Sequence, residues 1–543
     1  MSSINKKIYI NQAGYLPKDI KTAVLPVNVK SVSVVDKDDK EVYRAKCDHF
    51  GFDKPSGDDV YRADFSEVCA EGEYRLVSGD YYSDKFCIGD SAYDKAFYDL
   101  VRAYYYFRCG MELKSEHAGK FTHMPCHTEP ACEWFDHSVT KDVSGGWHDA
   151  GDYGRYVTAG AVALGHLLYA FVLFPKTFEK RDFGIPKTPG LPDFLTECKY
   201  ELDWLLKMQK PDGGVYHKAS TAQHADFVMP EDDLGQMYLL PVSSMAVADF
   251  AAVCALAYRV YAEYDKEYAD RLLQAAKRSA EWLDNNPDFI GFRNPEGCGT
   301  GDYCESNDKD NRFWAYSELY ASTGDCEYLN KAEKLSDYGF SKTDLGWGAV
   351  GGLGALAYIT LRAEWRDESK AKEYGDMYIS SAESLLQTAN QSGYMAAMGE
   401  RSYSWGSNMT LMKNAMIFAI ADIISPNKEF SHSAKAQFDV LMGVNAMGIS
   451  YVTGNGDSAY NYPHLRPAFA DRIKECIPGM VSGGPNSYRN ELYIRQFIPE
   501  GTPPMKCFAD RTELYSVNEV TIYWNSPAVF VTAYLLDGKD GMR

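Results

Sequence analysis

The stretch FCIGDSAYDKAFYDLVRAYYYFR, residues 86–108, contains the point at which the chain changes from β-structure to helix. Before it, apolar and polar residues alternate in short runs, which is typical of half-buried strands. From Ala96 onward, apolar residues recur every three or four positions, as on one face of a helix. A Gly-Asp-Ser turn separates the two patterns. We therefore predict a boundary near Ile88 to Ala92, between a domain of residues 1–88 and a domain of residues 89–543.

The N-terminal domain is predicted to be a small β-sandwich. Six short segments of alternating character precede the boundary and are separated by Gly, Pro, Asp and Lys. A series of short strands divided by turn residues is typical of such a sandwich. The segments are KKIYINQ (6–12), KTAVLPV (21–27), SVSVVDK (31–37), KEVYRAK (40–46), VYRADFS (60–66) and GEYRLVS (72–78).

The C-terminal domain is predicted to be mostly helical. About twelve apolar or amphipathic segments of helical length follow the boundary, joined by long loops rich in Gly, Asp and aromatic residues. An even set of helices suggests pairs that close into an α/α barrel, with the functional residues on the loops. The longest irregular stretch runs from about residue 445 to residue 520, and a loop of that length is usually functional.

The charge of the chain restricts its partners. Of 543 residues, 56 are Lys or Arg and 76 are Asp or Glu, which gives a formal net charge of -20. So acidic a protein is not expected to bind nucleic acid or an acidic membrane surface. A neutral partner fits better, because aromatic residues make up 14% of the chain and flat rings stack well on pyranose sugars.

The sequence contains no run of about 18 apolar residues, and no apolar segment follows the lysines near its start. Its 13 cysteines are an odd number without the dense spacing of a disulfide framework, so most are expected to be reduced thiols. We expect a cytoplasmic protein that neither spans a membrane nor is exported. Prior removal of a leader peptide would make it a secreted protein instead.

The segment SGGWHDAGDYGRYV, residues 144–157, places Asp149 and Asp152 three residues apart, just before a predicted helix. Glycines allow backbone and side chains to crowd together, and a helix N-terminus favours ionised carboxylates. Two carboxylates in this position could activate a water molecule. The same spacing also fits an N-cap Asp beside a surface Asp, and these residues alone leave both interpretations open.

The segment FADRTELYSVNEVTIYWNS, residues 508–526, sets Asp510 and Glu519 among apolar and aromatic residues. Burial beside such residues raises the pKa of a carboxyl group, as a general acid at neutral pH requires. By itself the segment also fits the start of a helix with Glu519 at its solvent end.

A third polar segment, SYVTGNGDSAYNYPHLRP (450–467), contains His464 and Arg466, which could hydrogen-bond to sugar hydroxyls. The combination of these segments resembles glycoside hydrolase family 9, the inverting cellulases with an (α/α)6 barrel, over essentially the whole chain. Residues 8–24 resemble the immunoglobulin-like N-terminal module of one branch of that family. Further landmarks are GGWHDAGDYGRYV (145–157), PDGGVYHKAS (211–220), WGSN (405–408) and GGPN (483–486). The family's C-terminal signature is matched at Phe508, Asp510, Tyr515, Glu519, Thr521, Asn525 and Ser526.

The resemblance implies a mostly α fold, in which an (α/α)6-barrel catalytic domain follows a small immunoglobulin-like β-sandwich. It also implies that Asp152 is the general base, that Asp149 helps to hold the nucleophilic water, and that Glu519 is the general acid. In an inverting hydrolase the acid protonates the glycosidic oxygen while the base activates water on the opposite face of the sugar. The residues implied around the −1 sugar and the acid are His464, Arg466 and Asp510. The implied sugar contacts are His217, Trp405 and Trp524, although Trp524 also fits a core aromatic.

A structural zinc site is implied by the motifs RCG, PCH and GGWH. Their ligands would be Cys109, Cys126, His127 and His148. Mixed thiolate and imidazole ligands suit a tetrahedral Zn²⁺, but the first gap is not a CxxC, so the spacing alone identifies no site. Four protein ligands leave no open coordination position, and the zinc would therefore be structural. Alternative ligands are His117, His123 and Cys132.

Members of this family also often bind calcium near an acidic pair that precedes a Trp. Here the pair is Asp310 and Asn311, and Gly348 follows Trp347 in the loop where the family supplies a further Asp. Loss of carboxylates weakens a site for a hard cation. Calcium at Asp310 is therefore expected to be weak or absent, although the segment 304–311 is rich in oxygen ligands.

These observations predict an inverting endo-1,4-β-glucanase that acts on cellulose or cellodextrins. An exo-acting cellodextrinase, a β-glucosidase or a glucosaminidase stays open, because the shape of the loops decides between them. A sugar-binding protein without catalysis is the alternative from another class, and the presence of all three carboxyl residues disfavours it. The expected partner is a β-1,4-glucan or cello-oligosaccharide, and the oligomeric state is left open.

Overall fold

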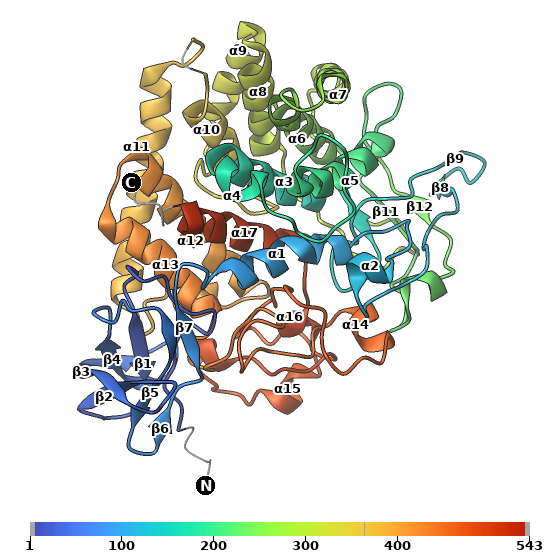
Figure 1. Ribbon diagram of the computed structural model, residues 1–543. Coiled ribbons are helices and arrows are strands. Elements are labelled where there is room, and N and C mark those ends of the chain that lie inside the picture. The colour runs from blue at the N-terminus through green and yellow to red at the C-terminus, as the bar shows by residue number, and fades with distance from the viewer. Residues whose placement is uncertain (1–5, 363, 538–543) are drawn as a thin grey trace.

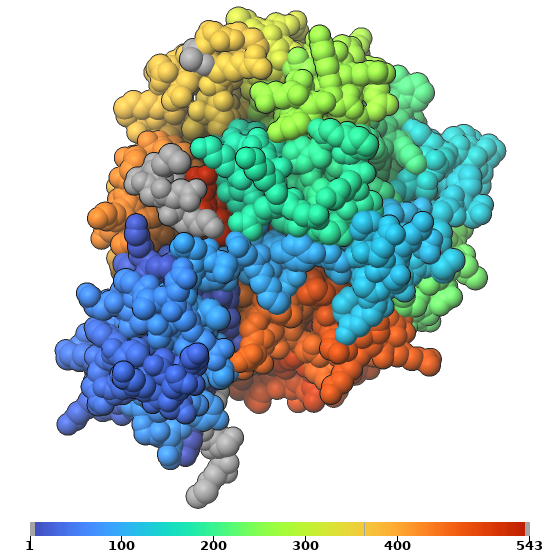
Figure 2. Space-filling model, viewed as in Figure 1, coloured from blue at the N-terminus to red at the C-terminus, as the bar shows by residue number. Residues whose placement is uncertain are grey.

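The structure is a computed structural model that describes residues 6–362 and 364–537. A β-domain at the N-terminus and a larger helical domain follow one another along the chain (Figure 1). Figure 2 shows the β-domain, in blue, as a lobe at one edge of the helical body. The fold class predicted from the sequence is confirmed.

The β-domain buries the alternating apolar residues of its strands in a core of its own. Val32, Val34 and Leu76 are fully buried. Their strand neighbours Ser33, Arg75 and Val77 are partly exposed. The strand order is β1-β4-β3-β2-β5-β6, and β7 pairs with β5. The strands are β1 (Thr22–Leu25), β2 (Ser31–Asp36), β3 (Glu41–Asp53), β4 (Asp58–Asp64), β5 (Gly72–Ser78), β6 (Tyr81–Tyr82) and β7 (Phe86–Ile88).

Five of the six predicted segments contain strands. The first segment, residues 6–12, forms only isolated bridges, such as the one from Tyr9 to Val24. Strand β7 ends at Ile88, and the first helix begins at Asp94. The domain limits at 88 and 89 stay a prediction, and their outer ends at residues 1 and 543 lie outside the described residues.

Twelve helices of the described chain form two rings. The inner ring consists of α3 (Val157–Leu173), α6 (Ser244–Tyr261), α8 (Lys309–Thr323), α10 (Gly351–Ile359), α12 (Ser407–Ile424) and α17 (Ile522–Asp537). The outer ring consists of α1 (Asp94–Tyr106), α5 (Asp193–Met208), α7 (Lys266–Asn285), α9 (Cys326–Ser336), α11 (Glu368–Asn390) and α13 (Lys428–Leu441). Each inner helix packs on at least one outer helix, and α3, the first inner helix, packs on both α6 and the last inner helix, α17.

The two rings differ in sequence because they differ in surroundings. The inner helix α6 is apolar on nearly all sides, as expected for a helix enclosed by others, whereas the outer helix α7 is amphipathic. Helix α6 is the single described helix that is long and apolar enough to cross a membrane, but 89% of it is buried inside the protein. Ser243 caps α6 and Asp265 caps α7, each by accepting a backbone N–H from the first turn.

The loops between the helices carry the shorter elements. A five-stranded sheet of order β10-β11-β12-β8-β9 gathers separate loops at one end of the barrel. Its strands are β8 (Ala131–Glu133), β9 (Thr140–Lys141), β10 (Arg155–Tyr156), β11 (Lys218–Ser220) and β12 (Tyr238–Leu239). The short helices are α2 (Ser115–Ala118), α4 (Pro175–Glu179), α14 (Arg466–Ala470), α15 (Ile494–Phe497) and α16 (Tyr515–Asn518).

Candidate active site

An open cavity of about 630 Å³ lies among the loops that precede the inner helices. Its wall contains all three of the predicted catalytic carboxyl residues, together with both predicted sugar-contacting tryptophans. The residues concerned are Asp149, Asp152, Glu519, Trp405 and Trp524. Further aromatic rings in the wall belong to Tyr156, Tyr303, Trp347 and Tyr523. Such a cavity presents flat apolar surfaces and a few carboxyl groups, which suits a neutral sugar chain.

The loop that carries Asp149 and Asp152 is held by close backbone contacts. A Cβ atom at Gly151 would lie 2.0 Å from the carbonyl oxygen of His464, so only glycine fits there. The backbone N–H of Ile522 donates to the carbonyl of Asp149 over 2.9 Å, which joins this loop to the C-terminal signature. Helix α3 begins at Val157, with Tyr156 as its N-cap, so neither Asp is an N-cap residue.

Asp149 lies behind the cavity surface and is 1% exposed. Burial raises the pKa of its carboxyl group well above the usual value, although the hydroxyl of Tyr303 donates to Oδ2 over 2.5 Å. Its Oδ1 has no hydrogen-bond partner among the described residues. This second oxygen is a buried polar atom whose hydrogen-bonding capacity is unused by the described residues.

The pKa of Asp152 is shifted in the opposite direction, below its usual value. Burial favours its neutral form, but a hydrogen bond and the charge of His224, together with the charge of Arg466, outweigh burial and hold the pKa of Asp152 below its usual value. His224 Nδ1 lies 3.0 Å from Asp152 Oδ2. Asp152 is therefore an ionised carboxylate at neutral pH, as a general base must be.

Glu519 follows α16 directly and lines the same cavity. Burial, and then the negative charges of Asp152 and Asp149, raise its pKa well above the usual value of a glutamate. A carboxyl group that keeps its proton near neutral pH can serve as a general acid. One cavity thus contains a carboxylate and a protonated carboxyl group.

His464 and Arg466 support the carboxyl residues from behind. His464 Nδ1 lies 2.6 Å from the carbonyl oxygen of Thr512, and burial lowers the pKa of His464 to about 4, so its ring is neutral. Arg466 is buried and donates to the carbonyl oxygens of Gly151 and Ala225, each over 2.7 Å. These bonds fix the loop of Asp152 and bring a positive charge close to it. The structure therefore gives Arg466 a bracing position, and its contact with sugar hydroxyls stays a prediction.

Besides His464 and Arg466, two more predicted site residues lie outside the cavity wall. Asp510 accepts the backbone N–H groups of Asn461 and Tyr462 over 2.9 and 2.8 Å, and so holds the long loop that carries His464. His217 is fully buried, and its ring nitrogens lie within 2.9 Å of Ser243 Oγ and the carbonyl oxygen of Asp302. The prediction of His217 as a sugar contact is corrected here, because its ring is enclosed by protein.

The tryptophans differ in exposure. Trp405 lines the cavity and is 48% exposed, whereas Trp524 is 4% exposed and packs beside Tyr523. Sequence reasoning missed His224 and Tyr303, which touch the two aspartates directly. Tyr303 has a φ of 45°, a backbone conformation rare outside glycine, but nothing in the sequence around it indicates this.

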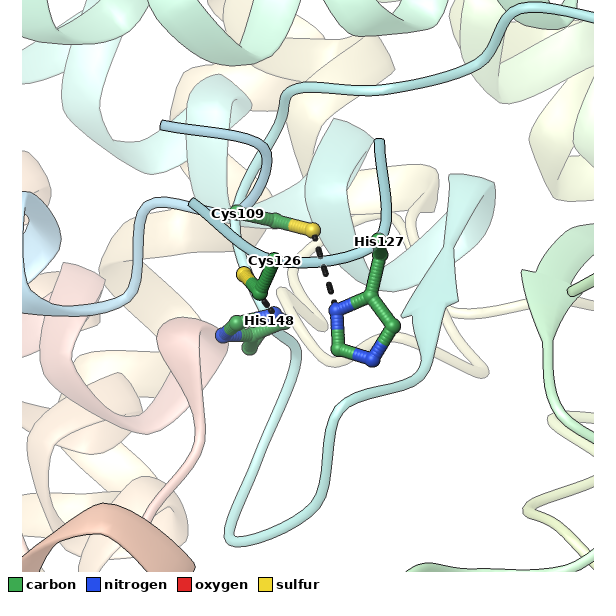
Figure 3. Close-up of side chains that lie close together, drawn as sticks. All are labelled: Cys109, Cys126, His127 and His148. Carbon is green, nitrogen blue, oxygen red and sulfur yellow. Dashed lines mark hydrogen bonds between the residues drawn. The ribbon is translucent and has the colours of Figure 1, made fainter. Parts of the chain in front are cut away.

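The four predicted zinc ligands converge beside this loop, and Figure 3 shows their side chains directed toward one another. One ligand atom from each residue lies within 4.8 Å of the others. Cys109 Sγ lies 3.7 Å from His127 Nδ1, and Cys126 Sγ lies 3.9 Å from His148 Nε2. The second ring nitrogen of His127 lies 3.1 Å from Asp233 Oδ2, an outer partner typical of metal-binding histidines.

Backbone bonds connect the cluster to the catalytic loop. Cys109 N–H donates to the carbonyl of Gly146, and His148 N–H donates to the carbonyl of Phe107. The alternative ligands are directed elsewhere: His117 Nδ1 lies 3.0 Å from the carbonyl oxygen of Gly184, and His123 Nδ1 lies 2.7 Å from that of Met124.

In the described part of the chain, this cluster is the only convergent group of three or more metal-binding side chains. Asp310 Oδ2 accepts the backbone N–H of Val350 over 2.9 Å, and the amide of Asn311 donates to Asp249 and Glu305. Calcium at Asp310 stays a prediction.

A double ring of helices whose loops hold a carboxylate and a protonated carboxyl group in an aromatic cavity defines the chain as a glycoside hydrolase. Residues 93–532 match the family model of glycosyl hydrolase family 9, and residues 4–83 match that of the cellulase N-terminal ig-like domain. The chain therefore belongs to glycosyl hydrolase family 9.

Several proteins are similar to the chain over its whole length. A cellodextrinase from Butyrivibrio fibrisolvens is 44% identical, with 98% of this chain and 100% of the relative covered. The structure of AaCel9A in complex with cellobiose-like isofagomine superimposes with a TM-score of 0.92 at 32% identity and covers 98% of this chain and 99% of that one. A Zn-binding triple mutant of the GH family 9 endoglucanase J30 gives a TM-score of 0.90 at 35% identity, with coverages of 95% and 99%.

Proposed function

We propose that the chain hydrolyses β-1,4-glucosidic bonds of cellulose or cellodextrins with inversion of configuration. The observation that carries this proposal is the opposite shift of two pKa values in one aromatic cavity, low for Asp152 and high for Glu519. The cellobiose-like ligand of AaCel9A and the names of the cellodextrinase and endoglucanase relatives support the choice of substrate.

In this mechanism Glu519 donates its proton to the glycosidic oxygen as the bond to the leaving sugar breaks. Asp152 removes a proton from a water molecule that attacks the anomeric carbon from the opposite face. The unpaired Oδ1 of Asp149 hydrogen-bonds to the same water, while Tyr303 donates to its other oxygen. We propose internal cleavage as the main mode. Release of short products is the alternative, because a cellodextrinase is among the similar proteins.

Proton NMR during hydrolysis of cellohexaose tests this function. Because water attacks opposite the leaving group, the newly formed reducing end should first carry the α-anomer. Glu519→Gln should lower turnover by several orders of magnitude while binding of cellohexaose persists. Release of the β-anomer first, or near-normal turnover by the variant, would refute the assignment. Mixed products would indicate internal cleavage, and a single short product would indicate exo action.

We further propose that Cys109, Cys126, His127 and His148 hold a structural zinc ion. Support comes from the convergence of the four ligand atoms and from the zinc-binding variant of endoglucanase J30. Zinc would add no chemistry to hydrolysis, because four protein ligands leave no open position. Elemental analysis of protein purified without added metal should find about one zinc ion per chain.

A further inference from the structure

We propose that the ion pair of Lys413 and Asp344 binds the hydroxyl groups of one glucose unit and so helps to set which chain lengths the enzyme prefers. The inference rests on the proposed glucanase function and concerns two charged residues of the cavity wall that the proposed mechanism does not use. Both residues line the cavity, and Lys413 Nζ lies 2.7 Å from Asp344 Oδ1.

The pair joins two walls of the cavity. Lys413 lies on α12 with Met409 and Thr410, which line the cavity one turn earlier. It is six residues after Ser407, the first residue of α12, or about 9 Å of helix rise beyond it. Asp344 lies in the loop before α10, three residues before Trp347. A sugar ring in this part of the cavity would therefore meet the pair as well as the aromatic wall.

The charges of the pair suit a neutral, hydroxyl-rich ligand. Asp344 neutralises Lys413 and would repel a sugar acid, so an anion is not the expected occupant. The ammonium group has three hydrogens, and the carboxylate has free acceptor capacity besides its bonds to Lys413 and the backbone N–H of Gly346. A vicinal diol can donate to the carboxylate and accept from the ammonium at the same time. The side chains are 16% and 34% exposed, so they are accessible yet partly desolvated, which strengthens such bonds.

A purely structural role would predict a different result. As a tie between α12 and the loop before α10, the pair would affect folding and all substrates equally. A sugar-binding role affects only those substrates that place a glucose unit beside the pair. The two roles are therefore separated by the dependence of kcat/KM on the number of glucose units.

The test compares Lys413→Met with Lys331→Met on cellotriose, cellotetraose, cellopentaose and cellohexaose. Lys331 Nζ lies 2.8 Å from Asp284 Oδ2, against 2.7 Å for Lys413 and Asp344, and its pair has side chains 24% and 38% exposed but lies outside the cavity. In the wild type, kcat/KM should increase as each glucose unit is added. In Lys413→Met, the increase at one of these additions should be about tenfold smaller, mainly because KM is higher, as expected for loss of a hydrogen bond to a charged group. Lys331→Met should retain the wild-type series. In Asp344→Asn, the increase in kcat/KM should be reduced at the same chain length.

Melting temperatures of the variants serve as the check on folding. A uniform fall of kcat/KM at every chain length, or an unchanged series in a folded variant, would overturn the inference. If the wild-type enzyme hydrolysed none of the four oligosaccharides, the proposed glucanase function itself would fail, which is a separate outcome. Cellohexaose labelled at its reducing end should show a changed cleavage position only in the Lys413 and Asp344 variants.

Discussion

At the scale of single residues, the catalytic assignment depends on different surroundings for similar groups. Asp149, Asp152 and Glu519 are all carboxyl residues in one cavity, yet only Asp152 receives a hydrogen bond from an imidazole. Burial alone would keep all three protonated. The position of His224 therefore decides which of them is the base.

Replacing His224 by Ala should move the acidic limb of the pH profile. The wild-type contact holds the pKa of Asp152 below its usual value, so its loss should raise that pKa. Because the base must be ionised, the acidic limb of kcat/KM should shift to higher pH, while the basic limb set by Glu519 stays in place. The measurement is kcat/KM from pH 3 to 9, and His137→Ala, an exposed histidine elsewhere, serves as control. An unmoved acidic limb would contradict this role, even if activity fell at every pH.

Some site residues could be predicted from the sequence and others could not. Asp149, Asp152 and Glu519 stand in segments that match motifs of the family, and that resemblance indicated their roles where the local residues alone left two interpretations open. His224 and Tyr303 reach the site through contacts across 72 and 154 residues, and no local pattern encodes such a contact. His217 carried the same motif evidence as Trp405 but lies behind the wall, because a motif does not show which way a side chain points.

At the scale of elements, helices were more predictable than the short strands. Inner helices such as α3 and α6 are long and apolar, so their residues alone indicate buried helices. The five-stranded sheet was not predicted, because its strands have two or three residues and pair across loops that lie far apart in the sequence. Replacement of one of the proposed zinc ligands tests whether a metal ion holds these loops together.

Cys126→Ser should loosen the loop between Gly110 and Gly146 and lower activity without changing a catalytic group. Zinc would close this long loop. Loss of the zinc would restore the conformational entropy of the open loop and would free the turn before Asp149. We expect a lower melting temperature and a lower kcat, measured by calorimetry and by hydrolysis of cellohexaose. Cys132→Ser is the matched control, since Cys132 is a buried thiol on β8 outside the cluster. Full activity and unchanged melting in metal-free protein would contradict a zinc-dependent loop.

At the scale of the whole molecule, the β-sandwich and the barrel are joined by specific polar contacts. Asn11 donates to Asp439 of α13 over 2.8 Å, and Arg62 donates to the carbonyl oxygen of Gly393 over 2.9 Å. Asp58 on β4 accepts from the hydroxyl of Tyr394 over 2.8 Å. These contacts lie away from the catalytic cavity, so we infer that the sandwich contributes to stability rather than to bond cleavage.

Asp58→Ala should therefore destabilise the protein while leaving catalysis intact. Asp58 has a side chain only 13% exposed and also pairs with Lys506 over 2.5 Å, so its removal takes the acceptor from the buried hydroxyl of Tyr394 and from the partly exposed ammonium of Lys506. Loss of one partner of a buried hydrogen bond costs about 1–3 kcal/mol, and we expect a lower melting temperature in a single transition. Asp48→Ala is the control, because Asp48 on β3 has a side chain 72% exposed and its ion pair with Lys46 should contribute little. Calorimetry measures both variants, and kcat/KM on cellotetraose should match the wild type. Two separate transitions, with the barrel melting at its original temperature, would mean that the domains are not coupled through Asp58.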